Sequence, residues 1–338
     1  MSEETARPVR VWCTDLSFGA CALNEHILSL MPPYVLDPET PELLFYESFG
    51  EDHKRYSCPR IFISGENERA YFTYADYAIG MDYMEFGDRY LRVPLWAYYK
   101  PALSLLAARR PVSAADLAGR EFCMTIVSNG IYADPIRDRF FLALHARRPV
   151  ASLGRHLRND DRLDQAQPGQ HNQPKLALQG KFLFSLAFEN SSSPGYVTEK
   201  LMEAAALGTI PIYWGDPLVA RDFNPEAFVN RMDFADDEAC IDYILALAED
   251  PERMAQMLNA PLFRDPGLPA AYDEKLREFL ARIVAQPAES RGRQVLYGRR
   301  KVVEDEKKAA ERHRFKERFP GLRWSLVKLL ERKPHGKG

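Results

Sequence analysis

The stretch from Phe182 to Pro217 limits the fold of this chain more than any other part of the sequence. It consists of an apolar run, a polar turn-forming segment, a run of strong helix formers and a second apolar, β-branched run, at residues 182–188, 189–195, 199–207 and 209–214. Gly208 stands where a helix commonly ends on a glycine. This order predicts a βαβ unit with both strands buried in a parallel sheet.

One residue of this unit opposes the helix dipole. Thr198 is placed to cap the helix, so Lys200 falls in its first turn. A cation there is disfavoured by about 0.3–1 kcal/mol, unless an anion is also present. The free N–H groups of a helix start, together with a lysine, form a phosphate site. The alternative is a solvated lysine that tolerates the dipole.

The rest of the chain repeats the alternation of strands and helices. We expect strands at 9–14, 43–46, 60–64, 76–80 and 122–127, and helices at 19–30, 115–118, 236–250, from 251 onward, and at 272–285. A length of 338 residues suffices for two domains. The alternation predicts an α/β protein of Rossmann-like halves, with domains at 1–148 and 149–298 and a tail at 299–338.

A second helix start carries a cation. The strand expected at 122–127 leads to Ser128 and Asn129, and a helix capped by Asp134 follows. Arg137 lies in its first turn, again against the dipole. We therefore expect Arg137 and Lys200, one from each predicted half, to converge on one diphosphate. A solvated arginine is the alternative interpretation, and Arg139 is the alternative cation.

Two acids follow another expected strand. Gly65-Glu66-Asn67-Glu68 comes after the strand at 60–64, at the carboxyl edge where open α/β sheets place their chemistry. A hydroxyl group is a poor nucleophile at neutral pH, so a carboxylate at such an edge could act as a general base. A pair of solvated loop acids is the alternative.

Composition excludes several classes of protein. The five cysteines are scattered and contain no CxxC pair, so neither a disulfide framework nor a cysteine metal site is expected. No phosphate-binding G-x-x-x-x-G-K motif, dinucleotide G-x-G-x-x-G motif or H-E-x-x-H motif occurs. No run of about 18 apolar residues occurs, and the first ten residues are polar, so neither a membrane span nor a signal peptide is expected.

The charge is uneven along the chain. Residues 299–338 carry a net charge of +8, and since the whole chain carries −3, residues 1–298 carry −11. The segment 322–333 places Trp and several Leu among Lys and Arg, as in helices that lie on anionic membranes. Packing on the acidic body, or on a second copy, is the alternative.

The fixed residues of the central unit resemble a known family. Phe188-Glu189-Asn190-Ser191, Tyr196-Val197-Thr198-Glu199-Lys200 and Ile210-Pro211-Ile212-Tyr213-Trp214-Gly215 resemble the signature of the α1,3-fucosyltransferases, glycosyltransferase family 10. Asp222-Phe223-Asn224-Pro225 and Phe228-Val229-Asn230 resemble its bacterial members. Gly195 departs from the Asp that animal members often carry before the Tyr. The resemblance covers roughly residues 60–260 and implies a GT-B fold, with two Rossmann-like domains facing across a cleft.

The resemblance also implies an activity. It is the transfer of L-fucose, with inversion, from GDP-fucose to the 3-hydroxyl of GlcNAc in N-acetyllactosamine-type, lipopolysaccharide-like glycans. Glu66 is implied as the base, with Glu68 as the alternative, and Arg137 and Lys200 as the cations that hold the departing GDP. Glu199 is implied to contact the donor ribose or the developing positive charge. Ser128, Asn129, Asn190 and Tyr196 are implied in the donor pocket.

Other interpretations stay open. Another GDP-sugar, an α1,4 linkage or a non-catalytic nucleotide- or glycan-binding module would use the same pattern. No cofactor and no metal site are expected, and a divalent metal ion would at most stimulate the reaction. The expected partners are a GDP-sugar and an oligosaccharide or glycolipid acceptor, without nucleic acid. We expect a bacterial cytoplasmic enzyme with peripheral contact to the inner face of the cell membrane.

Overall fold

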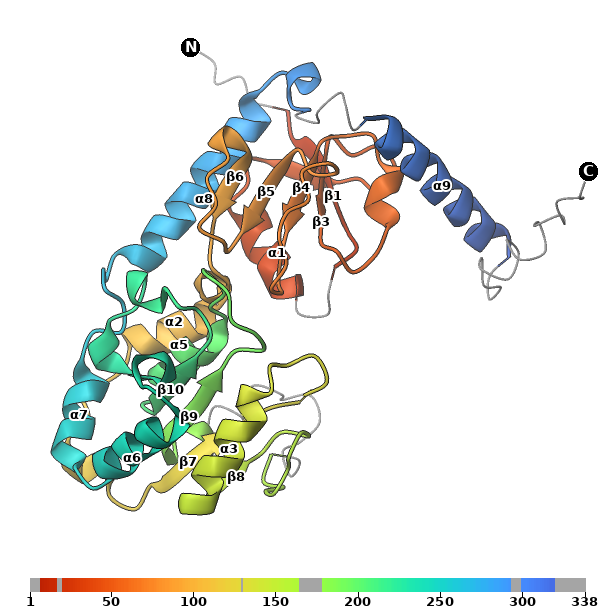
Figure 1. Ribbon diagram of the computed structural model, residues 1–338. Helices are drawn as coiled ribbons and strands as arrows, with labels where there is room; N and C mark the ends of the chain where they lie inside the picture. Colours follow the sequence, from red (N-terminus) through yellow and green to blue (C-terminus); the bar gives the residue numbers. More distant parts are fainter. Residues whose placement is uncertain (1–6, 17–19, 129, 164–177, 293–298, 320–338) are drawn as a thin grey trace, which may run out of the picture. The chain divides into compact units, whose positions relative to one another are not determined.

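The computed structural model describes residues 7–16, 20–128, 130–163, 178–292 and 299–319 (Figure 1). These residues form two compact units. Of the described residues, unit 1 contains those within the ranges 7–80, 84–91 and 275–319, and unit 2 contains those within the ranges 81–83 and 92–274. The long helix α8 (Leu268–Ala285) contributes residues to both units.

Unit 1 is built on a six-stranded sheet in the order β2-β1-β3-β4-β5-β6. Its strands are β1 (Val9–Thr14), β2 (Tyr34–Leu36), β3 (Leu43–Tyr46), β4 (Arg60–Ile63), β5 (Tyr77–Gly80) and β6 (Tyr90–Arg92). The pairs from β2 through to β5 are parallel. Every residue of β3, β4 and β5 is buried, which explains why these strands were visible in the sequence as short apolar runs.

Unit 2 is built on a five-stranded parallel sheet in the order β11-β10-β9-β7-β8. Its strands are β7 (Glu121–Thr125), β8 (Val150–Ser152), β9 (Phe182–Phe188), β10 (Ile210–Trp214) and β11 (Val229–Asn230). The predicted βαβ unit is confirmed as β9, α5 and β10, with Phe184 paired to Ile210 and Phe188 to Trp214.

The helices also follow the apolar patterns of the sequence. Unit 1 contains α1 (Ala20–Ser29) and α9 (Arg299–Arg318). Unit 2 contains α2 (Lys100–Ala107), α3 (Ile136–Arg147), α5 (Glu199–Ala206), α6 (Asp237–Ala248) and α7 (Pro251–Asn259). One hydrophobic core joins side chains of β7, β9 and β10 to α3, α6 and α7. The helix expected at 115–118 is instead a short 3-10 turn at Ala114–Leu117.

The predicted domain boundary at residue 148 differs from the division in the structure. Strand β7 pairs with β9, with Cys123 opposite Phe184, and α3 packs into the same core as α6. Residues 92–148 therefore belong with the second sheet. Because α8 leads the chain back to unit 1, residues 275–292 do not belong to unit 2 either.

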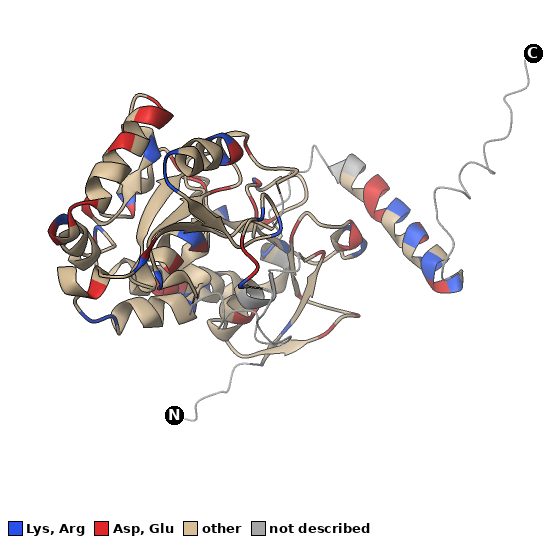
Figure 2. Cartoon of the chain, turned by 90° about the horizontal axis from the view of Figure 1, so that it is seen from below, with Lys and Arg blue, Asp and Glu red and all other residues tan. Residues whose placement is uncertain are grey.

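Helix α9 confirms a basic helix in the tail, and it is packed on unit 1. Val302 and Ala309 are buried, Glu306 pairs with the fully buried guanidinium of Arg60, and Asp305 accepts a hydrogen bond from Tyr74. Figure 2 shows Lys and Arg positions along α9 beyond the acidic turn near its start. The segment 322–333, for which we predicted membrane contact, lies outside the described residues.

Candidate functional site

A buried glutamate lies at the carboxyl end of β9. Glu189 follows β9 directly and is fully buried. Its carboxylate accepts the Thr198 N–H at 2.8 Å, the Thr198 hydroxyl at 2.7 Å and the Lys200 ammonium at 3.1 Å. The Thr198 hydroxyl therefore binds Glu189, and makes no side-chain cap hydrogen bond to the helix it precedes. This carboxylate organises the turn from β9 into α5.

Lys200 is the first cation of the site. Besides Glu189, its ammonium donates to the Thr198 hydroxyl at 2.8 Å and lies 3.6 Å from the Glu199 carboxylate. Burial alone would lower the pKa of Lys200, but the charges of Glu189 and Glu199 outweigh it and hold the pKa above its ordinary value. Lys200 is therefore a permanent cation with a quarter of its side chain exposed.

Arg137 is the second cation. It lies in the first turn of α3, as predicted, and is only 8% exposed. Its guanidinium donates to the side-chain oxygen of Asn190 at 2.5 Å, and the Asn190 carbonyl accepts the Asp134 N–H at 2.7 Å. Burial lowers the pKa of Arg137, although Glu189 and Asp138 oppose this. Asn190 thus ties the start of α3 to the loop after β9.

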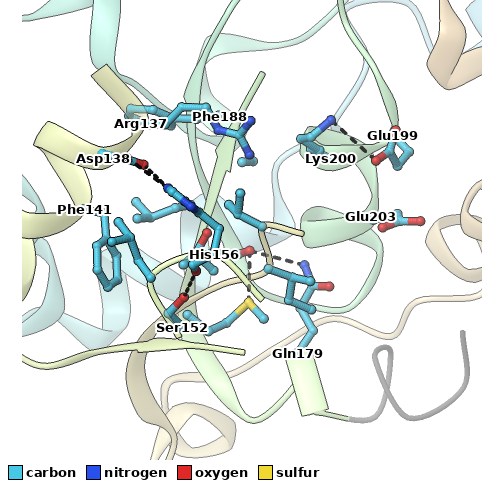
Figure 3. Close-up of a pocket in the computed structure, with 18 residues that line it drawn as sticks. Arg137, Asp138, Phe141, Ser152, His156, Gln179, Phe188, Glu199, Lys200 and Glu203 are labelled. Carbon is cyan, nitrogen blue, oxygen red and sulfur yellow. Dashed lines mark hydrogen bonds and ion pairs between the residues drawn. The ribbon is translucent and has the colours of Figure 1, made fainter. Parts of the chain in front are cut away.

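The two cations line one pocket, and both belong to unit 2. Figure 3 shows Arg137 entering it from α3 and Lys200 from α5. The prediction that one cation comes from each half is therefore wrong, because the β7–α3 segment belongs to the same sheet as the β9–α5 segment. In a parallel sheet, helix starts that follow neighbouring strands meet at the carboxyl edge. Such an edge, with two cations, suits a diphosphate.

The other residues predicted to bind the GDP-sugar differ in their relation to this pocket. Glu199 lines the pocket and receives a hydrogen bond from Tyr99. Asn190 is placed beside Arg137, whereas Ser128 is exposed three residues after the end of β7 and Asn129 lies outside the described residues. Tyr196 is 1% exposed, close enough to both cations to affect the pKa of each.

Tyr196 lies in a loop that is held in place by hydrogen bonds from the buried side of the loop. The fully buried Tyr213 donates to its carbonyl at 3.4 Å and accepts the Asp216 N–H at 2.9 Å. Gly195 has φ +92°, and a side chain there would collide with the Met81 carbonyl. Glycine is therefore required at this position in this chain.

Arg139, the alternative cation, is placed elsewhere. Its guanidinium pairs with Asp237 at the start of α6 at 2.7 Å, and 61% of its side chain is exposed. It does not line the pocket of Figure 3. The structure therefore favours Arg137 over Arg139 as the pocket cation.

Sequence reasoning missed two features of this pocket. Glu189 was counted in the turn-forming segment and in the family signature but was given no role, although an acid directly after a fully apolar strand was a usable signal. His156 also enters the pocket, where its ring Nε2–H donates a hydrogen bond to the Asp138 carboxylate at 2.8 Å (Figure 3). No local pattern marked His156, because its partner lies 18 residues away on α3.

Glu66 and Glu68 lie in unit 1, in the loop after β4. Both are exposed. Partial burial and the charge of Glu47 raise the pKa of Glu68 above its ordinary value. The loop is internally bonded, because the Ser64 hydroxyl donates to the Glu66 carbonyl at 2.6 Å and the Glu68 N–H donates to the same carbonyl at 2.7 Å. Their roles remain predictions.

The described residues contain neither a metal-binding cluster nor a membrane-spanning helix. Across residues 7–16, 20–128, 130–163, 178–292 and 299–319, no group of three or more His, Cys, Asp or Glu side chains could hold a metal ion. None of the helices described there is long and apolar enough to cross a membrane.

The two α/β units, each built on a largely parallel sheet, define a class of fold, the GT-B type. Residues 24–99 match the model of the α-(1,3)-fucosyltransferase FucT N-terminal domain, and residues 119–259 match that of the glycosyltransferase family 10 (fucosyltransferase) C-terminal region. The chain belongs to glycosyltransferase family 10. The second match includes β7 and α3, which belong to unit 2, whereas the first match extends beyond unit 1 to residue 99.

Individual relatives agree with this assignment. The α-(1,3)-fucosyltransferase FucT of Helicobacter pylori is 35% identical over 254 residues, which are 65% of this chain and 51% of the relative. A crystal structure of an α1,3-fucosyltransferase with GDP-fucose is 28% identical, has a TM-score of 0.63 and covers 82% of this chain and 93% of its own. A GDP-fucose protein O-fucosyltransferase 3 of Xenopus laevis is 26% identical over 63% of this chain and 49% of the relative. The chain thus spans about half the length of these curated relatives.

Proposed function

We propose that this chain is an inverting fucosyltransferase. It transfers L-fucose from GDP-fucose to the 3-hydroxyl of GlcNAc in N-acetyllactosamine-type glycans, including lipopolysaccharide O-antigen-like acceptors. The observation that carries the proposal is the pairing of Arg137 and Lys200 in one pocket at the carboxyl edge of the unit 2 sheet. The similarity to an α1,3-fucosyltransferase structure that contains GDP-fucose supports GDP-fucose as the donor.

Each proposed role follows from charge. The departing GDP gains negative charge as the sugar bond breaks, and Arg137 and Lys200 stabilise that charge without a metal ion. Glu199, which lies at the pocket and pairs with Lys200, contacts the donor ribose or the positive charge that develops on the sugar. Asn190 orients Arg137, and Tyr196 supports the same pocket from within the fold.

The proposed base is Glu66. It removes the proton of the acceptor hydroxyl as the new bond forms, so the hydroxyl attacks as the better nucleophile. Its exposed carboxylate, on an internally bonded loop at the carboxyl edge of β4, supports this role. Glu68 is the alternative base, and its raised pKa supports that alternative.

A screen of donors against acceptors tests the proposal. GDP-fucose and GDP-mannose are each offered with N-acetyllactosamine, lacto-N-biose and a serine- or threonine-containing peptide domain. We expect transfer from GDP-fucose to the 3-hydroxyl of GlcNAc, with the anomeric configuration inverted between donor and product. Transfer from GDP-mannose alone would contradict the donor, and transfer to lacto-N-biose alone would favour an α1,4 linkage.

The peptide arm tests a second acceptor class. The similarity to protein O-fucosyltransferases favours it, although the identity is lower than to the glycan enzymes. Transfer of fucose to the peptide hydroxyl, with no transfer to the oligosaccharides, would contradict the proposed glycan acceptor and support a protein acceptor. Tight GDP binding without any transfer would favour a binding module.

We also propose peripheral contact with an anionic membrane on the cytoplasmic side. The net charge of +8 over residues 299–338 supports it. The amphipathic segment 322–333 would supply the apolar contact. Flotation with anionic and neutral liposomes tests this proposal, and equal behaviour with both would contradict it.

A further inference from the structure

A buried carboxylate lies beneath the loop that carries the proposed base. Glu47 directly follows β3 and is 1% exposed. Strand β3 is parallel to β4, with Tyr46 opposite Phe62, so Glu47 lies level with the last residue of β4. One carboxylate oxygen of Glu47 accepts the Gly65 N–H at 2.8 Å. Gly65 immediately precedes Glu66.

The loop is held at Gly65 and at Glu66 itself. The Glu47 carboxylate fixes the Gly65 amide, directly before Glu66, from the interior of the sheet edge. The Ser64 hydroxyl accepts the Glu66 N–H at 3.2 Å and donates to the Glu66 carbonyl at 2.6 Å. The Glu66 backbone therefore has little freedom, while its side chain remains exposed.

Burying a carboxylate is costly, and replacing buried charges by apolar groups is often neutral or stabilising. Stability of the sheet is therefore a weak reason for a glutamate at this position. A general base, by contrast, works only within hydrogen-bond reach of its proton, and a misplacement of about 1 Å can cost about 100-fold in rate. We propose that Glu47 is a positioning residue, which fixes the loop carrying Glu66 by holding the Gly65 amide.

This inference rests on the proposed role of Glu66 as general base. Three substitutions of Glu47 separate the effect of its hydrogen bond to Gly65 from the effect of its negative charge. Glu47→Gln retains an oxygen that can accept the Gly65 N–H and removes the charge. Glu47→Ala removes both, and Glu47→Asp retains the charge but withdraws the carboxylate by one methylene.

The test measures kcat and KM for fucosyl transfer by the full chain. For Glu47→Ala we expect a loss of kcat of about 10- to 100-fold, with the KM for GDP-fucose unchanged within about twofold. Glu47→Gln should keep at least about a third of the wild-type kcat. If Glu47→Ala does not fold, Glu47→Asp replaces it, with an expected loss of about tenfold. A wild-type kcat for Glu47→Ala, or for Glu47→Asp where it replaces Ala, would overturn the inference. Equal losses of kcat for Glu47→Gln and Glu47→Ala would also overturn it.

A matched control lies at the other end of the same strand. Glu42 precedes β3 and likewise accepts a backbone N–H, that of Arg10, at 3.1 Å. Glu42→Ala should leave kcat unchanged, and a loss equal to that of Glu47→Ala would mean that any defect at β3 lowers the rate.

A double-mutant cycle separates positioning from a general structural effect. In the Glu66→Gln chain, Glu47→Ala should cause no further loss of residual kcat, because Glu47 acts through Glu66. A further loss as large as in the wild type would overturn the inference. If Glu66→Gln keeps wild-type kcat, the base assignment and the inference both fall. If Glu66→Gln is inactive and Glu47→Ala is fully active, only the positioning role falls.

Discussion

Lys200 and Glu189 form an ion pair of 3.1 Å at the start of α5, with the carboxylate fully buried. The position of Lys200 against the helix dipole suggested that an anion must be present. The chain itself supplies one, since Glu189 is the anion. The dipole penalty is at most about 1 kcal/mol, whereas breaking a buried ion pair from one side costs about 3–5 kcal/mol. A bound diphosphate therefore adds to a charge balance that already exists.

The first prediction concerns the stability of this pair. Glu189→Ala leaves the Lys200 ammonium and the Thr198 N–H without their carboxylate, so the free energy of unfolding should fall by about 3 kcal/mol. Urea denaturation measures it. Glu249→Ala is the control, because Glu249 pairs with Arg148 at 3.0 Å on the surface with 77% of its side chain exposed, and less than about 1 kcal/mol is expected. Similar losses in both variants would contradict the structural role of Glu189.

The second prediction concerns the phosphate cations. Arg137→Ala and Lys200→Ala should each lower kcat/KM for GDP-fucose by about 100-fold or more, because each removes a charge that stabilises the departing GDP. Arg139→Ala removes an arginine only two residues away, paired with Asp237, and should leave kcat/KM nearly unchanged. Wild-type kinetics for the first two variants, or a large loss for the third, would show that the cations are misassigned.

The third prediction separates Glu66 from Glu68. Glu66→Gln should leave only a small residual turnover while GDP still binds with unchanged affinity, because a base is needed for the chemical step and not for the nucleotide. Isothermal titration with GDP and a transfer assay measure the two properties. If Glu68→Gln is the inactive variant and Glu66→Gln remains active, the base is Glu68.

The fourth prediction concerns the tail. Truncation after Arg299 removes Glu306 from the buried guanidinium of Arg60 and uncovers the surface that Val302 and Ala309 cover. We expect it to lower the unfolding temperature. Truncation after Phe319 keeps α9 and should spare activity while reducing binding to anionic liposomes.

The outcome of the two truncations can be read independently. Thermal unfolding reports on α9, and flotation reports on residues 320–338. Equal unfolding temperatures for the two truncated chains would contradict the packing of α9 on unit 1.

Much of the fold was predictable because its strands are buried on both faces. Strands β1, β3 and β9 begin and end at the predicted residues, since continuous apolar runs bounded by turn formers leave little choice. The domain boundary was not predictable from such patterns. The β7–α3 segment has the same local sequence pattern as a segment of either sheet, and only the pairing of β7 with β9 decides its membership.

The candidate site was partly predictable for a similar reason. Arg137 and Lys200 were visible because each opposes a helix dipole, which is a local property. The partners of these cations were not visible, because Asn190 lies 53 residues from Arg137 and Glu189 reaches Lys200 across a turn. His156 shows the same limit, since nothing near it in the sequence indicates Asp138.

Both cations and their partners come from unit 2, whereas Glu66 and Glu47 come from unit 1. The kind of defect caused by an inherited or engineered loss-of-function substitution should therefore depend on the unit in which the substitution lies. Changes in residues 92–274 would give proteins that cannot retain the nucleotide, and changes around residues 47–68 would give proteins that retain it and release it unused. A simple nucleotide-affinity column would then separate the two kinds of defect before any sugar product is analysed.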